Sequence, residues 1–279
     1  MHRPDSAASR LGELDLPSVI GHRGAAGVAP ENTLGGLRRA SALGCKWVEF
    51  DVRLTADREL ILFHDDRLER TTDSCGSVGA LPSSAIRCCD AGAWFDASFA
   101  GERVPTLAEA IELLSELGLG ANVELKSQRG NAIQTGMAAA DLLARLWPQH
   151  LPRPLISSFS PDTLEAARYR APTMARGLLL RGAGGRWRRA EALGCATVNA
   201  DHRFLRPAVV AQIRNAGYSV LAYTVNEPAR ARELFAWGVC SVFSDVPHMI
   251  LAQMPPGLPQ SNATPPPLLA GSARREALM

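Results

Sequence analysis

Two carboxylates in the segment WVEFDV have the spacing expected of a metal site. Glu49 and Asp51 are two residues apart, and the residues between and beside them are apolar. Side chains alternate between the two faces of a β-strand, so both carboxylates would lie on one face. An isolated pair of this kind can also point to solvent. Glu124, near the end of the apolar run in NVELK, adds a third carboxylate. A charge within such a strand is costly unless it is paired or bound to metal. The three residues therefore predict a site for one divalent cation, Mg²⁺ or Ca²⁺.

Two histidines, His22 and His64, directly follow apolar runs. Imidazole titrates near neutral pH, so two histidines on opposite sides of a bond could act as general acid and general base. Arg23 and Lys126 could contact a phosphate, the arginine as a bidentate fork and the lysine as a point charge. Taken singly, each of these side chains could instead be structural or solvated. Together with three carboxylates they predict an active site.

The elements that would position these residues alternate along the chain. Eight short apolar runs are separated mostly by amphipathic segments, a pattern typical of parallel strands joined by helical crossovers. The expected strands are residues 17–21, 46–52, 121–125, 154–159, 175–180, 196–200, 219–225 and 240–245. Eight such units predict an α/β fold of the (β/α)₈ TIM-barrel type, in which residues at the carboxyl ends of the strands build the site.

A ninth strand-like run, residues 59–64, follows the run at 46–53 too closely for a parallel crossover. We expect it to pair antiparallel with the extended second strand, outside the set of eight, which returns His64 to the level of the paired carboxylates. Residues 65–104 are too long for a simple loop and are expected to form a small inserted cap, with a short helix within 82–88.

Local signals place the starts of two helices. Thr106 followed by Glu109 has the pattern of a capping box. Thr33 in PENT is expected to cap the first barrel helix, with Asn32 as the alternative cap.

Composition limits the domain organisation and the partners. The 279 residues are 46% hydrophobic, and 30 basic against 28 acidic residues give a net charge of +2. We expect one barrel domain over residues 18–252, a flexible segment over 1–17 and a Pro-rich disordered tail over 253–279. The weak charge does not favour nucleic acid or an acidic membrane surface.

The expected location is the cytoplasm. The six cysteines form no CxxC pair or metal-finger spacing, as expected of reduced thiols. The chain shows no signal-peptide pattern and no run of roughly 18 apolar residues that could span a membrane, so no stable membrane association is expected.

The order of the motifs resembles that of a known family. HRG, PENT, ExD, HDxxLxRTT, VPTL, ELK, SSF, YTVN and GVxSVFSDVP follow one another over residues 19–247. This series is similar to the glycerophosphodiester phosphodiesterase family of cytoplasmic bacterial type, a metal-dependent barrel with a small insertion after the HD motif. The resemblance implies that Glu49, Asp51 and Glu124 are the metal ligands. It implies that His22 and His64 are the acid–base pair, and that Arg23 and Lys126 contact the phosphate.

The resemblance also implies the reaction, which is hydrolysis of a small glycerophosphodiester to sn-glycerol 3-phosphate and an alcohol. Tyr223 stands where the family usually has tryptophan, and it is expected to line the pocket and to influence the choice of alcohol. Phe159 in SSF is either a pocket wall or a core residue, and His202 follows a strand and could rim the site.

Two other functions remain as alternatives. The same residues could serve phospholipase D-like action on lysophospholipids, or the barrel could be catalytically inactive and only bind its ligand. No motif specifies an oligomeric state.

Overall fold

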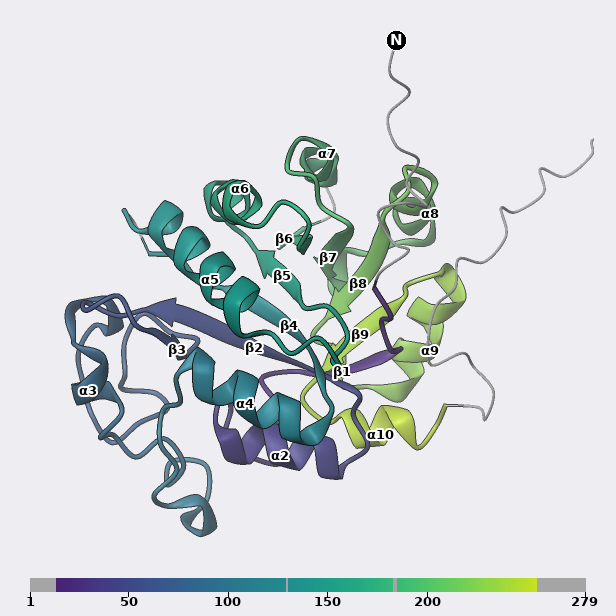
Figure 1. Cartoon of the computed structure of the whole chain (residues 1–279). Coiled ribbons are helices and arrows are strands. Elements are labelled where there is room, and N and C mark those ends of the chain that lie inside the picture. Colours follow the sequence, from purple (N-terminus) through teal and green to yellow (C-terminus); the bar gives the residue numbers. More distant parts are fainter. Residues whose placement is uncertain (1–13, 129, 183–184, 255–279) are drawn as a thin grey trace, which may run out of the picture.

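The computed structural model describes residues 14–128, 130–182 and 185–254. Within these residues eight parallel strands close into a barrel, because β1 pairs with both β9 and β2 (Figure 1). The strands are β1 (Val19–Gly21), β2 (Trp47–Leu54), β4 (Gly120–Leu125), β5 (Leu155–Ser158), β6 (Ala175–Leu180), β7 (Thr197–Asp201), β8 (Ser219–Tyr223) and β9 (Ser241–Ser244). The predicted TIM barrel and each of its eight expected strands are confirmed.

Helices connect the strands and surround the barrel (Figure 1). They are α2 (Leu34–Ala42), α4 (Leu107–Leu117), α5 (Ala132–Leu146), α6 (Pro161–Arg170), α7 (Arg189–Ala192), α8 (Pro207–Asn215), α9 (Pro228–Trp237) and α10 (Pro247–Leu251). Two 3₁₀ turns, η3 (Arg186–Arg188) and η4 (His202–Phe204), lie in the later connections. None of the helices within the described residues is long and apolar enough to cross a membrane.

The expected hairpin is present. β3 (Leu60–Leu62) pairs antiparallel with β2, with Val52 opposite Leu62 and Leu54 opposite Leu60. The Phe63 backbone N–H then donates to the carbonyl of Asp51 at 2.9 Å, so the chain re-enters the site one residue before His64.

Residues 65–104 form the cap and lie beside β2 and β3 in Figure 1. This segment contains η1 (Val78–Ala80), α3 (Ser83–Ile86) and η2 (Ala97–Phe99), so the helix expected within 82–88 is confirmed. The cap has a small hydrophobic core of its own, which includes Leu68, Val78, Ile86, Ala91 and Val104 and is joined by Ile61 and Phe63 from the hairpin.

Both predicted helix starts are present. The Thr106 hydroxyl accepts from the Glu109 N–H and the Glu109 carboxylate accepts from the Thr106 N–H, which completes the capping box. Thr33 caps α2 by accepting from the Gly36 N–H at 2.9 Å. The alternative cap, Asn32, instead has a left-handed φ of 56° and turns its side chain toward β2.

Two hydrophobic layers fix the position of the site. The larger layer, which includes Val48, Phe50 and Val52, packs between the strands and the helices. The smaller cluster contains Trp47, which lies on the same face of β2 as Glu49 and Asp51 and therefore fills the barrel interior at the strand starts. Within the described residues this cluster fills the barrel interior below the carboxylates and leaves the carboxyl ends of the strands for a ligand.

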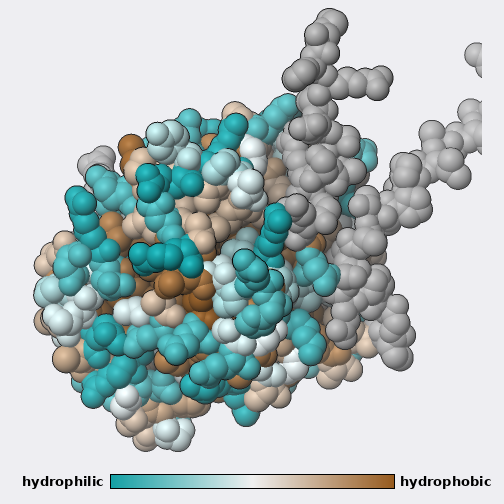
Figure 2. Space-filling view, in the orientation of Figure 1, coloured by the Kyte–Doolittle hydropathy of each residue, from teal (hydrophilic) through white to brown (hydrophobic). Residues whose placement is uncertain are grey.

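The face in Figure 2 carries mostly hydrophilic residues, with hydrophobic residues showing mainly near its centre. The expected flexible start and Pro-rich tail fall, over residues 1–13 and 255–279, outside the described residues. Of the expected N-terminal segment 1–17, residues 14–17 are described, and Leu16 among them is buried in the smaller hydrophobic cluster.

Candidate active site

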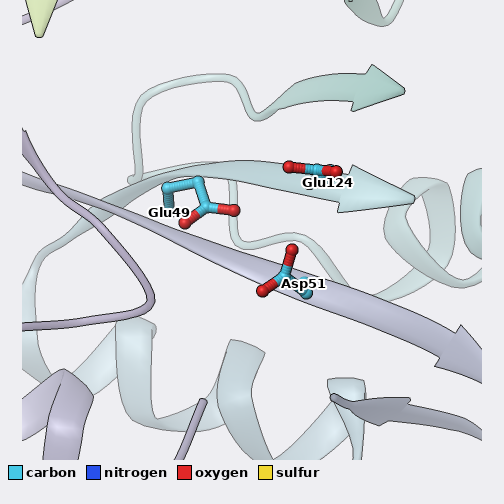
Figure 3. Close-up of side chains that lie close together, drawn as sticks. All are labelled: Glu49, Asp51 and Glu124. Carbon is cyan, nitrogen blue, oxygen red and sulfur yellow. The ribbon is translucent and has the colours of Figure 1, made fainter. Parts of the chain in front are cut away.

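Strand register brings the three predicted carboxylates together. β2 and β4 pair in parallel with Asp51 opposite Glu124 and Glu49 opposite Asn122, so the acids on both strands share the inner face of the barrel. Figure 3 shows Glu49 and Asp51 on one strand and Glu124 on its neighbour, with their carboxylates close together. One oxygen from each lies within 4.8 Å of the others.

The environment of these acids fits a divalent cation. All three are almost fully buried, with exposed fractions of 2%, 1% and 7% for Glu49, Asp51 and Glu124. Burial and the charge of Asp51 raise the pKa of both Glu49 and Glu124, because like charges in a water-poor site repel one another. The Glu49 Oε1 atom is buried without a hydrogen-bond partner. A hard cation would satisfy this oxygen and offset the repulsion.

Asp51 is the most strongly held member of the triad. Lys126 Nζ lies 3.1 Å from its Oδ1, Arg23 Nε lies 3.2 Å from its Oδ2, and Asn32 Nδ2 donates to Oδ2 at 2.9 Å. Burial raises the pKa of Asp51, but Lys126 and Arg23 lower it more, so Asp51 stays ionised. Lys126 also contacts Glu124, which places both predicted phosphate-binding cations directly beside the acids.

His22 follows β1 and is oriented by a carboxylate from the far end of the chain. Its Nδ1 lies 2.6 Å from Asp245 Oδ1, and its Nε2 lies 3.8 Å from Glu49 Oε2. Burial lowers the pKa of His22, but Glu49 and the hydrogen bond to Asp245 raise it more, so the pKa lies above its usual value. Asn226 holds Asp245 in turn, by donating to Oδ2 at 2.7 Å.

His64 has the same arrangement on the other side of the triad. Its Nδ1 lies 2.5 Å from Asp65 Oδ1, and its backbone carbonyl accepts two hydrogen bonds from Arg53, at 2.8 and 2.6 Å. Burial lowers the pKa of His64, and although Asp51 raises it, Lys126 lowers it again, so the pKa lies below its usual value. In each histidine Nδ1 contacts a carboxylate, and the pKa shifts of the two rings run in opposite directions.

An ion-pair network joins the cap to the barrel. Arg70 of the cap contacts Asp65 at 2.7 Å and Glu31 at 2.8 Å, and Glu31 also lies 2.8 Å from Arg23. Arg70 thus links the carboxylate behind His64 to the carboxylate behind Arg23. The cap orients groups on both sides of the site through this single guanidinium.

These residues surround a cavity of about 700 Å³ at the carboxyl ends of the strands. Of the residues predicted from sequence, all but Asp51 line it: His22, Arg23, Glu49, His64, Glu124, Lys126, Phe159 and Tyr223. His202 lines it as well. The rings of Phe159 and Tyr223 meet edge to face at 6.0 Å, and the Tyr223 hydroxyl donates to the Leu180 carbonyl at 2.7 Å.

Sequence reasoning missed the groups that orient the histidines. Asp245 and Asp65 lay within quoted motifs, SDVP and HD, but nothing local shows that either contacts an imidazole. The position of Arg53 could have been predicted from the sequence. Glu49, Asp51 and Arg53 occupy every second position of β2, so the three side chains share its inner face.

Comparison with known proteins identifies one family that this chain resembles. Residues 22–249 match the glycerophosphoryl diester phosphodiesterase family. A glycerophosphodiester phosphodiesterase of Caldanaerobacter subterraneus is 31% identical over 84% of this chain and 96% of its own length. A solved Oleispira antarctica phosphodiesterase, in complex with the product sn-glycerol-3-phosphate, is 41% identical, with a TM-score of 0.83 and coverage of 89% and 98%. An Agrobacterium tumefaciens glycerophosphodiester phosphodiesterase structure is 30% identical, with a TM-score of 0.73 over 85% of this chain and 100% of that one.

Proposed function

This chain belongs to the glycerophosphoryl diester phosphodiesterase family, and from that premise we propose that it hydrolyses small glycerophosphodiesters to sn-glycerol 3-phosphate and an alcohol. The observation that carries the proposal is a single cavity containing two carboxylate-backed histidines beside a buried triad of acids. The product bound by the Oleispira antarctica relative supports the choice of product.

The chemistry needs one proton acceptor and one proton donor. Water forms a bond to phosphorus and the bond from phosphorus to the alcohol oxygen breaks; alternatively the neighbouring glycerol hydroxyl displaces the alcohol first, and water then opens the cyclic phosphate by adding to phosphorus as a ring P–O bond breaks. We assign proton donation to the departing alcohol to His22, because Glu49 and the hydrogen bond to Asp245 raise its pKa and so favour the protonated imidazolium. His64, whose pKa is lowered, accepts the proton of the nucleophile. Arg23 and Lys126 balance the phosphate charge.

Glu49, Asp51 and Glu124 would hold one divalent cation, Mg²⁺ or Ca²⁺. When bound, the cation would stabilise the negative charge that develops on the phosphate oxygens. The chain's contribution is to keep the three carboxylates buried and converged, with Arg23 and Lys126 close enough to limit their mutual repulsion.

The proposed location is the cytoplasm. Cys45, Cys75, Cys88, Cys89 and Cys195 are free thiols, which supports a reducing compartment. The proposed substrate is a small soluble diester; neither nucleic acid nor a membrane surface is expected as a partner.

The test couples release of sn-glycerol 3-phosphate to its dehydrogenase, using EDTA-treated protein with Mg²⁺ or Ca²⁺ added back. We expect glycerophosphoglycerol and glycerophosphocholine to yield glycerol 3-phosphate only when a cation is restored. The Glu49→Gln variant should lose both activity and cation binding measured by calorimetry, while retaining its melting temperature within a few degrees.

Two results would contradict the proposal. Free choline without glycerol 3-phosphate from lysophosphatidylcholine, with the soluble diesters untouched, would establish the phospholipase D-like alternative. Binding of diesters without turnover under any cation would establish an inactive barrel.

A further inference from the structure

One side of the cavity carries polar residues that the proposed proton transfers do not use. It lies at the carboxyl ends of β6, β7 and β8, which β9 and β5 separate from the strands that carry the acids and histidines. We call this side the β6–β8 wall, and it consists of Arg181, Asp201, His202, Arg203, Phe204 and Tyr223.

The β6–β8 wall is positively charged. Asp201 and Arg203 neutralise one another, with Arg203 Nη2 lying 2.6 Å from Asp201 Oδ2 and Nε lying 3.0 Å from Oδ1. Arg181 has no carboxylate within ion-pair distance among residues 14–128, 130–182 and 185–254. Its guanidinium is therefore an uncompensated charge at the cavity.

The aromatic surface of the cavity already faces cations. The Arg181 guanidinium carbon lies 5.2 Å from the centroid of the Phe159 ring, and Lys126 Nζ lies 5.6 Å from the same centroid. A quaternary ammonium group binds proteins through such a ring face. Here a choline would meet two resident cations at the ring, whereas an anion would be attracted to them.

The two arms of a diester differ in what they offer to such a cavity. Glycerol is neutral, and its hydroxyls can donate to the side of the cavity where Glu49 and Glu124 lie. The alcohol arm must then extend from the phosphorus toward the opposite side. A negative group on that arm could accept bidentate hydrogen bonds from Arg181.

We propose that the β6–β8 wall is the subsite for the alcohol arm, and that Arg181 makes the enzyme select glycerophosphodiesters whose alcohol carries a second phosphate. This inference rests on the proposed function and names its substrate class. A choline or ethanolamine arm is disfavoured because it would bring a positive charge to the same wall.

The test compares two substrates that differ by one phosphoglycerol unit, which brings the second phosphate. Bis(glycerophospho)glycerol is glycerophosphoglycerol with one further phosphoglycerol unit, and glycerophosphocholine is the cationic comparison. Initial rates of glycerol 3-phosphate release give kcat/KM for each. We expect kcat/KM for bis(glycerophospho)glycerol to exceed that for glycerophosphoglycerol by about tenfold, which corresponds to one hydrogen bond to a charged group. We expect glycerophosphocholine to have the lowest kcat/KM of the three. Raising the ionic strength should reduce the differences in kcat/KM between the three substrates, because added salt screens an exposed guanidinium.

The variant Arg181→Met should reduce the ratio of kcat/KM for bis(glycerophospho)glycerol to kcat/KM for glycerophosphoglycerol by about tenfold. Arg188→Met is the matched control, because Arg188 also stacks on an aromatic ring, 4.8 Å from the Trp187 centroid, but does not line the cavity. The control should leave all three rates unchanged.

Equal rates for the three diesters, a preference for choline, or a ratio that survives Arg181→Met would overturn the selectivity and leave the proposed hydrolysis intact. Absence of glycerol 3-phosphate from all three substrates would overturn the proposed function and this inference with it.

Discussion

The carboxylates behind the two histidines should control opposite limbs of the pH profile. Asp245→Asn removes the negative charge 2.6 Å from His22 Nδ1 while keeping the size of the side chain. The new amide cannot accept from both His22 and Asn226, so one of two hydrogen bonds is lost as well. Because Asp245 raises the pKa of His22, its removal lowers that pKa.

The magnitude follows from the contact that is lost. A hydrogen bond to a charged group contributes about 1.5–3 kcal/mol. One pKa unit corresponds to roughly 1.4 kcal/mol, so the pKa of His22 should fall by about 1–2 units. If His22 is the general acid, activity requires its protonated form. The alkaline limb of kcat should therefore move by about 1–2 units toward lower pH, and at pH values above the wild-type limb kcat should fall by about 10–100-fold.

Asp65→Asn is the matched change on the other side. It removes the carboxylate 2.5 Å from His64 Nδ1 and should lower the pKa of His64. A general base is active when neutral, so the acidic limb should move toward lower pH while the alkaline limb stays in place.

The assay for both variants is kcat for glycerophosphoglycerol from pH 5 to 10 with saturating cation, with melting temperatures as the control for folding. Movement of the same limb in both variants, or of neither, would refute the assignment of separate acid and base roles. If Asp245→Asn moved the acidic limb and Asp65→Asn moved the alkaline limb, His22 would be the general base and His64 the general acid.

Three further predictions concern stability and thiol chemistry. Thr106→Ala removes the hydroxyl of the capping box and should destabilise the protein by about 1 kcal/mol in urea unfolding. Gly136→Ala would place a Cβ 2.3 Å from the Thr163 carbonyl, where α5 and α6 are in close contact, and should cost about 1–3 kcal/mol despite the better helix propensity of alanine; unchanged stability would show that the two helices can separate. Burial raises the pKa of Cys45 to about 12, so at pH 8 this thiol should resist iodoacetamide while the exposed Cys75 is alkylated, as read by peptide mass spectrometry of the native protein; rapid labelling of Cys45 would contradict its burial.

The barrel could be predicted from sequence because its signals are local. Each strand is a short apolar run, and the link between β2 and β3 is too short for anything but a hairpin. The three carboxylates were predictable for the same reason, since alternation along β2 decides which side chains share a face. The register that sets Asp51 opposite Glu124 then completes the triad.

The support of the histidines could not be predicted because it is set by tertiary structure. Asp245 is 223 residues from His22 in the chain, and only closure of the barrel between β1 and β9 brings them together. Arg70 reaches Glu31 across 39 residues because the cap folds back over the first loop. An aspartate or arginine in a loop carries no local sign of the partner it will meet.

The most direct test of the account is the fate of oxygen from labelled water. Turnover of glycerophosphoglycerol in H₂¹⁸O, followed by ³¹P NMR, should give sn-glycerol 3-phosphate with one ¹⁸O on phosphorus. This result is predicted whether water attacks first or opens a cyclic phosphate. Label in the released alcohol, or conversion without sn-glycerol 3-phosphate, would contradict attack of water at phosphorus with proton transfer by His22 and His64.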